Sequence, residues 1–265
     1  AGTLPLSSNR RFFSRKCAPR SGRCAQAMPE ADDPKRGSAD PYQGRSRDEF
    51  FNPFASEDVG EPFSDHWEAK RRVAQAIREF TDVLVTSTPP TGQLHDIADA
   101  LEDQAAILAR SPRLYGLREF VTDGSHGGHG EINHELNAVG GWSNPLSPGL
   151  NMWIDGDKAF GTVRCGYAYE GPPGHIHGGF VAAILDQFLG MAQLAGGLPG
   201  MTGSLEIRYL KPTPLNTELS LEAVIEPAGG RKTRVKGEIR NGDTVTATAE
   251  GLFIRPKNPI ARPFS

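Results

Sequence analysis

One stretch of this 265-residue chain is apolar on almost every face of a helix, and it limits the possible folds more than any other feature. The stretch runs from Gly179 to about Ala195. Its apolar residues are Phe180, Val181, Ile184, Leu185, Phe188, Leu189, Met191 and Leu194. A helix that is apolar all round must be buried all round. We therefore expect other elements of the same domain to surround it.

Segments typical of β-strands lie on both sides of this helix. Leu150 to Ile154 and Lys158 to Cys165 precede it, joined by the turn Asp155-Gly156-Asp157. Four more strands are expected after it, over residues 202–209, 217–226, 233–240 and 244–254. A single helix among six strands excludes a doubly wound fold. The pattern predicts an α+β domain over residues 144–256, in which an antiparallel sheet curls around one long buried helix.

The chain before residue 65 is too polar to form a packed core. Residues 1–64 are rich in Pro, Gly, Ser and charge, and we expect a flexible arm there. Before the first acid, Glu30, stand only basic charges: Arg10, Arg11, Arg15, Lys16, Arg20 and Arg23. This composition is similar to that of a mitochondrial transit peptide, although Met28 also fits as an ordinary start. We expect a cytoplasmic protein, with a mitochondrial location as the alternative.

Two amphipathic helices are predicted over residues 65–116. Asp65 is the expected cap of the first, and Pro89-Pro90 separates it from the second. Their apolar stripes are Trp67, Val73, Ile77, Phe80 and Leu84, and then Leu94, Ile97, Leu101, Ala105 and Leu108. A helix pair alone buries too little surface, so we expect this appendage to pack on the domain that follows. Residues 117–143 are expected to form an irregular Gly-rich linker, and residues 257–265 a tail.

Charge, hydropathy and cysteine usage exclude several classes of protein. The net charge of −3 gives no indication of nucleic-acid binding. No stretch approaches the roughly 18 apolar residues of a membrane span. Cys17, Cys24 and Cys165 lack metal-ligand spacing and indicate a reducing compartment. Cys165 lies in an apolar strand, so we expect it in the core rather than acting as a nucleophile.

The tripeptide His177-Gly178-Gly179 stands where a loop enters the apolar helix. Glycines let a ligand approach the backbone, and the first amides of a helix lack partners within it. Such amides can hold the oxyanion that forms when a carbonyl is attacked, or the glycines can simply let helix and sheet pack. Asp186 lies nine positions after His177, inside the apolar helix. A carboxylate is costly to bury there without a partner, so Asp186 is a candidate catalytic residue. The alternatives are a structural aspartate that is hydrogen-bonded within the core and an aspartate that points into solvent.

The run HIHGGFVAAILDQFLG resembles the signature of hotdog-fold thioesterases of the PaaI-like acyl-CoA branch, which includes the THEM-type enzymes. The following MTGSLEIRYLKPTP is similar to the strand after the helix in that family. The resemblance covers about residues 144–256. It implies a hotdog fold and hydrolysis of acyl-CoA thioesters, with medium- to long-chain fatty acyl groups favoured. No cofactor is expected.

The resemblance also implies roles for individual residues. It makes Asp186 the general base or nucleophile, and it places the hydroxyl of Thr202, 16 positions further on, beside it as an assisting group. It puts the amide of Gly178 in the oxyanion hole. His177 takes a positioning role, and Gly179 is expected among the substrate-binding residues.

Spacing along the apolar helix adds a requirement for two subunits. Eight residues separate Gly178 from Asp186, or about 12 Å at roughly 1.5 Å per residue. One thioester carbonyl cannot touch both groups in one chain. If both act on one carbonyl, they come from different subunits, and we expect a homodimer, with a dimer of dimers left open.

Basic residues in the second half of the domain are candidates for binding the phosphates of coenzyme A. They are Arg208, Lys211, Arg231, Lys232 and Arg234, of which the first four are our candidate substrate-binding residues. The alternative is that they are solvated charges at the ends of hairpins.

A second H-G-G tripeptide, His126-Gly127-Gly128, has Glu135 nine positions on. The intervening residues are polar and include Gly130, so we expect a solvated loop and reject it as a catalytic site. The potential metal ligands there are His126, His129, Glu131 and His134. Because a Gly-rich loop is no regular scaffold for them, we expect no metal site.

Two other functions were weighed against hydrolysis. A hotdog module that binds acyl-CoA without cleaving it would have no need of a buried carboxylate at position 186. Hotdog hydratases resemble one another in having an Asp and a His that are five residues apart. No Asp in this sequence has a His at that spacing. The sequence does not distinguish CoA from carrier-protein thioesters.

Overall fold

The computed structural model describes residue 62 and residues 64–127, 129–193 and 200–255. The arm expected over residues 1–64 and the tail expected over 257–265 lie almost wholly outside the described residues. Six strands form one sheet in the order β1-β2-β4-β5-β6-β3, and every neighbouring pair is antiparallel. The strands are β1 (Asn151–Asp155), β2 (Lys158–Val163), β3 (Met201–Tyr209), β4 (Leu219–Pro227), β5 (Lys232–Asn241) and β6 (Thr244–Ile254).

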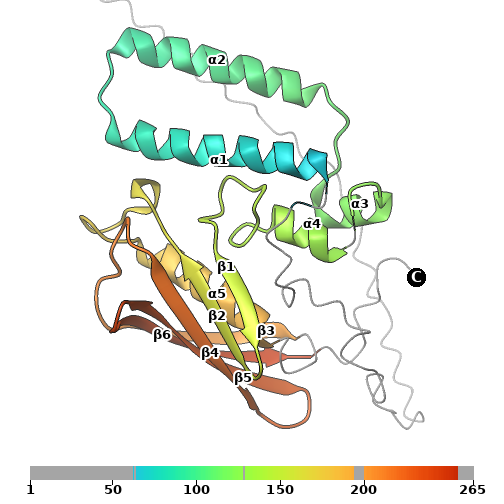
Figure 1. The fold of residues 1–265 in the computed structure, drawn as a ribbon, viewed down its shortest axis with the longest axis vertical. Coiled ribbons are helices and arrows are strands. Elements are labelled where there is room, and N and C mark those ends of the chain that lie inside the picture. The colour runs from blue at the N-terminus through green and yellow to red at the C-terminus, as the bar shows by residue number, and fades with distance from the viewer. Residues whose placement is uncertain (1–61, 63, 128, 194–199, 256–265) are drawn as a thin grey trace, which may run out of the picture. The chain divides into compact units, whose positions relative to one another are not determined.

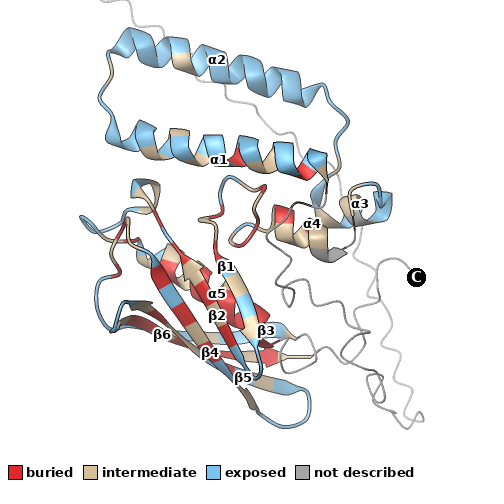
Figure 2. Ribbon diagram, viewed as in Figure 1, coloured by how far each residue is buried: buried red, intermediate tan, exposed pale blue. Residues whose placement is uncertain are grey.

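The apolar helix is α5 (Gly178–Ala192), and the sheet curls around it (Figure 1). Its buried residues pack against inward-facing residues of the strands, which alternate with outward-facing ones along each strand. Glycines on the sheet let the helix come close: a Cβ on Gly237 would lie 2.6 Å from Leu189 Cδ2. Most of the buried residues belong to α5 and to the strands around it, and a few more belong to α1 and α4 (Figure 2). This arrangement confirms the predicted α+β fold with one central helix.

Helix α1 (Asp65–Thr86) contacts the rest of the chain through a face that carries Trp67, Ala74 and several charged residues, so only the first residue of its predicted apolar stripe is fully buried. Arg78 donates to the backbone carbonyls of Trp142 and Asn144, and Asp82 accepts from the amide of Ala168 at 3.1 Å. Trp67 is fully buried, but most of the stripe is exposed, as is the face of α2 (Thr91–Ala109) that was expected to pack. Helix α1 therefore meets the domain that follows through Trp67 and through the bonds of Arg78 and Asp82. The expectation that the appendage packs through the stripe of α2 is wrong, since none of the residues of α2 is buried.

The predicted cap of α1 was displaced by one residue. Ser64, and not Asp65, is the N-cap, and its hydroxyl accepts a long hydrogen bond from the amide of Trp67 at 3.5 Å. Both residue types are favoured N-caps, so the sequence alone did not separate them.

Two short helices, α3 (Gly116–Asp123) and α4 (His129–Leu136), occupy much of the segment expected to be an irregular linker. The expectation of a solvated loop was also wrong, since Ile132 and Glu135 are buried in α4. The Glu135 carboxylate is held by Arg71 of α1 at 2.7 Å and accepts a hydrogen bond from the hydroxyl of Ser143 at 2.5 Å. These distant partners stabilise a helix that the local sequence does not favour.

No helix in the described part of the chain is both long enough and apolar enough to cross a bilayer.

Candidate active site

The candidate site begins at the first turn of α5, where His177 is the N-cap. Its Nδ1 atom accepts a hydrogen bond from the amide of Gly179 at 3.0 Å, so the imidazole carries its proton on Nε2 when neutral. The amide of Gly178 has no acceptor among the described residues. The first turn therefore presents one unused amide, at Gly178, at the positive end of the helix.

The backbone of His177 is fixed by two neighbouring segments. Its amide donates to the carbonyl of Tyr169 at 2.9 Å, and the adjacent amide of Ile176 donates to Thr213 at 2.8 Å. Gly171 passes so close that an added Cβ would lie 2.6 Å from the Cα of His177. A glycine is required there, and the turn is held from outside the helix.

Asp186 projects from the middle of α5 toward the start of β3. The hydroxyl of Thr202 donates to Asp186 Oδ1 at 3.3 Å, so the structure brings these two candidates together. In the single chain Asp186 is exposed, which differs from the burial expected of it. The reason is that β3 is an edge strand, so this side of α5 is left open where the sheet ends.

Tyr209, at the other end of β3, is a site residue that the sequence analysis missed. Its hydroxyl donates to the carbonyl of Gly178 at 2.9 Å, and its ring lies 3.6 Å from where a Cβ of Gly178 would be. A tyrosine near the end of a predicted strand gives no local signal of this contact. The contact exists because β3 and α5 run in opposite directions, which places the end of the strand at the start of the helix.

The contacts along β3 define two halves of a site. Asp186 and Thr202 lie at the start of the strand, and Gly178 and Tyr209 lie at its end. Gly178 and Asp186 are on one continuous helix, about 12 Å apart by the rise of an α-helix. Within one chain, the carboxylate and the unused amide do not reach the same small group.

Three comparisons with known proteins bear on this fold and site. The sequence profile of the thioesterase superfamily matches residues 173–248. A crystal structure of a thioesterase superfamily protein is 32% identical, with a TM-score of 0.60, and the alignment covers 73% of this chain and 96% of that one. The chain belongs to the thioesterase superfamily.

Curated relatives in the superfamily match a shorter part of the chain. The acyl-coenzyme A thioesterase THEM4 of Rattus norvegicus is 35% identical over 112 residues, which are 39% of this chain and 48% of the relative. The protein of the same name from Xenopus laevis is 36% identical over 90 residues, 32% of this chain and 40% of the relative. The chain spans about half the length of the curated relatives it matches, or less.

The basic residues expected to bind coenzyme A do not form one cluster in this chain. Arg208 and Lys211 lie at the end of β3. Arg231 and Lys232 lie at the opposite end of the sheet, because Lys232 pairs with Ile254 and Ile254 pairs with Met201 at the start of β3. Arg208 also forms an ion pair with Glu206.

Arg234, the fifth basic residue, pairs with Glu250 on β6. Arg231 donates to the carbonyl of Arg255, and Lys232 is exposed.

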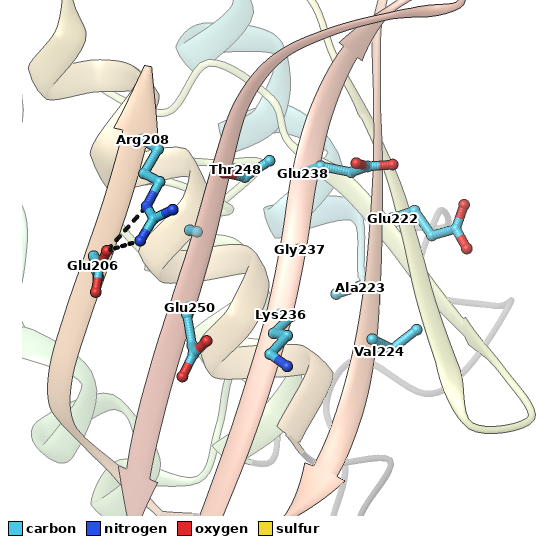
Figure 3. Close-up of a pocket in the computed structure, with 11 residues that line it drawn as sticks. Glu206, Arg208, Glu222, Ala223, Val224, Lys236, Gly237, Glu238, Thr248 and Glu250 are labelled. Atoms are coloured by element: carbon cyan, nitrogen blue, oxygen red, sulfur yellow. Dashed lines mark hydrogen bonds and ion pairs between the residues drawn. The ribbon is translucent and has the colours of Figure 1, made fainter. Parts of the chain in front are cut away.

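A hollow of about 430 Å³ lies on the sheet face that points away from α5 (Figure 3). Glu206, Glu222, Glu238 and Glu250 contribute four carboxylates to its walls, against Arg208 and Lys236. Asp186, Gly178 and Thr202 are not among its lining residues. We do not assign it to an acyl-CoA, because the net negative charge of its lining residues would repel the phosphates.

Cys165 is fully buried, and burial raises the pKa of its thiol to about 12. A thiol that stays protonated at neutral pH is a poor nucleophile. The structure thus agrees with the expectation that Cys165 belongs to the core.

Proposed function

We propose that this thioesterase-superfamily chain hydrolyses acyl-CoA thioesters to a free acid and CoA. The observation that carries the proposal is the hydrogen bond between Thr202 of β3 and Asp186 of α5. The first turn of the same helix presents the unused amide of Gly178. A carboxylate and an oxyanion-binding amide are the two groups that thioester hydrolysis needs. The THEM4 relatives are named as acyl-coenzyme A thioesterases, which supports the same reaction.

The reaction proceeds by attack of water on the thioester carbonyl carbon. The Asp186 carboxylate takes a proton from that water while the new C–O bond forms, and the Thr202 hydroxyl orients the carboxylate. The carbonyl oxygen becomes an oxyanion, which accepts a hydrogen bond from the Gly178 amide. The intermediate then collapses, the C–S bond breaks, and the departing sulfur takes the proton from Asp186. Direct attack by the carboxylate is the alternative first step.

A homodimer formed along β3 would complete the site. Strand β3 has nine residues and, among the described strands, pairs only with β6, so its outer edge is free to pair with another chain. Two copies pairing antiparallel along β3 would place the Thr202 end of one beside the Tyr209 end of the other. Asp186 of one subunit would then face Gly178 of the second, which removes the 12 Å separation.

The same dimer would bring the candidate CoA-binding basic residues close together. Arg208 and Lys211 of one subunit would lie at the end of the joined sheet that carries Arg231 and Lys232 of the second. This is where we place the phosphates of coenzyme A. The acyl group is proposed to be a medium- or long-chain fatty acyl group.

Release of free thiol from acyl-CoAs of graded chain length tests the proposed function. We expect the wild-type protein to release CoA, with the highest kcat/KM for medium or long chains. A protein that binds these acyl-CoAs and releases no thiol would be a sensor, and that result would contradict the proposal.

A further inference from the structure

The peptide group between Gly178 and Gly179 is held from both of its sides. Its carbonyl, on Gly178, accepts from the hydroxyl of Tyr209 at 2.9 Å. Its amide, on Gly179, donates to His177 Nδ1 at 3.0 Å. A peptide group is rigid and planar, so these two hydrogen bonds fix its rotation.

The consequence for Gly178 follows from chain geometry. The fixed peptide group begins at the Cα of Gly178, and glycine is the residue whose backbone rotates most freely. The preceding amide, that of Gly178, is the donor left without an acceptor among the described residues. That amide belongs to the preceding peptide group, whose carbonyl, on His177, accepts from the amides of Phe180 and Val181. Those bonds and the held carbonyl of Gly178 together restrict the direction in which the Gly178 amide points.

We propose that Tyr209 is a positioning residue, which aims the Gly178 amide at the oxyanion by bonding to the Gly178 carbonyl. The inference rests on the proposed function and adds to it a residue from the opposite end of β3. Tyr209 reaches the turn because its ring packs on the open side of the glycine, at ordinary van der Waals distance. Its role concerns the transition state and the tetrahedral intermediate, since the oxyanion is absent from the bound substrate.

The substitution Tyr209→Phe removes the hydroxyl and keeps the ring. One neutral hydrogen bond is lost, so we expect kcat to fall roughly 2- to 10-fold with KM within about twofold. The melting temperature should be unchanged. Tyr167→Phe is the matched control, because Tyr167 is an exposed tyrosine whose hydroxyl has no partner among the described residues, and it should leave kcat unaltered.

A double substitution separates positioning from a merely structural role. Gly178→Pro removes the amide hydrogen at the first position of α5, where proline fits a helix, and the extended backbone of His177 suits a residue before proline. If Tyr209 acts through that amide, Tyr209→Phe should lower kcat no further in the Gly178→Pro background. An equal loss in both backgrounds, or a rise in KM alone, would overturn the proposal.

Amide hydrogen exchange, followed by NMR, gives a readout that needs no turnover. In the Tyr209→Phe protein the Gly179 amide should exchange faster than in wild type, because its peptide group is held from one side only. An unchanged exchange rate would contradict the positioning role. Failure of the proposed function is recognised separately, as absence of thiol release by the wild-type protein.

Discussion

Asp186 is the residue on which the proposed chemistry depends. It is exposed in the single chain and bonded to one hydroxyl, so it is free to accept a proton from a bound water. Asp186→Asn keeps the size and the hydrogen bond to Thr202 but cannot act as a base. We expect it to lower kcat by roughly 10²–10⁴-fold, the usual worth of a positioned acid or base. Free-thiol release under saturating acyl-CoA measures the change.

Thr202→Val should cost less than Asp186→Asn, because it removes one orienting hydrogen bond and not the base. Asp157→Asn, in the β1–β2 turn, is the control and should have wild-type activity. Equal rates for Asp186→Asn and wild type would show that another group is the base.

His134 contributes a pH dependence to stability. Burial, assisted by the charge of Arg71, lowers the pKa of His134 from 6.5 to about 4. Between these values the unfolded chain binds a proton that the folded protein does not. The free energy of unfolding should therefore fall as pH decreases from 6.5 to 4, by up to about 3 kcal/mol at roughly 1.36 kcal/mol per pKa unit. Above pH 6.5 this contribution is fully present.

Urea unfolding of the wild-type and His134→Gln proteins at pH 7 and pH 4.5 isolates the contribution of His134 to the free energy of unfolding. The wild type should lose more stability between the two pH values than the variant does. His95→Gln, at an exposed histidine of α2, should behave as the wild type does. A variant that loses as much as the wild type would contradict the assignment to His134.

At the scale of elements, the contact between α1 and the turn before α5 can be tested directly. Asp82 accepts from the Ala168 amide, and Gly166 lies so close to the same carboxylate that an added Cβ would clash with it. Asp82→Ala should lower the free energy of unfolding by about 1–3 kcal/mol, as for other hydrogen bonds to charged groups. Asp96→Ala, on the exposed α2, is the matched control.

A double-mutant cycle tests the proximity of Asp82 and Gly166. Gly166→Ala should destabilise the wild type by clashing with the carboxylate, and it should cost much less in the Asp82→Ala background. Such coupling is expected only for residues in contact. Additive effects would mean that α1 does not lie against this turn.

The strands and α5 could be predicted from the sequence because their side chains alternate or are apolar all round. Strand β6 was placed at its observed bounds, and β3 began one residue earlier than expected. The packing of α1 and the helix α4 could not be predicted in this way. Both depend on Arg71, Arg78 and Asp82 bonding to groups more than 60 residues away, which local periodicity does not encode.

The site was predictable to a similar degree. His177 and Asp186 lie at the start and in the middle of one helix, and Thr202 lies on the strand that follows. Their fixed spacing in the sequence is therefore visible as a motif. The contact of Tyr209 with Gly178 could be predicted only by knowing that β3 runs antiparallel to α5. The exposure of Asp186 could be predicted only from the strand order, which makes β3 an edge strand.

For the whole molecule, we predict that each active site is shared by two subunits. In one chain Asp186 and Gly178 lie on the same helix about 12 Å apart, and each is bonded to a different end of β3. Pairing of two β3 edges would join the halves. A monomer that is fully active at high dilution would contradict this assembly.

The activity of a mixed dimer distinguishes a site shared by two subunits from a site within one chain. One subunit carries Asp186→Asn and the other Gly178→Pro, each with its own affinity tag, and the mixed dimer is purified through both tags. If each site is shared, one site contains both substitutions and the other contains neither. We therefore expect about half of the wild-type kcat per dimer, while each variant homodimer stays nearly inactive. A mixed dimer as inactive as the two homodimers would show that Asp186 and Gly178 act from the same chain, and would contradict a shared site.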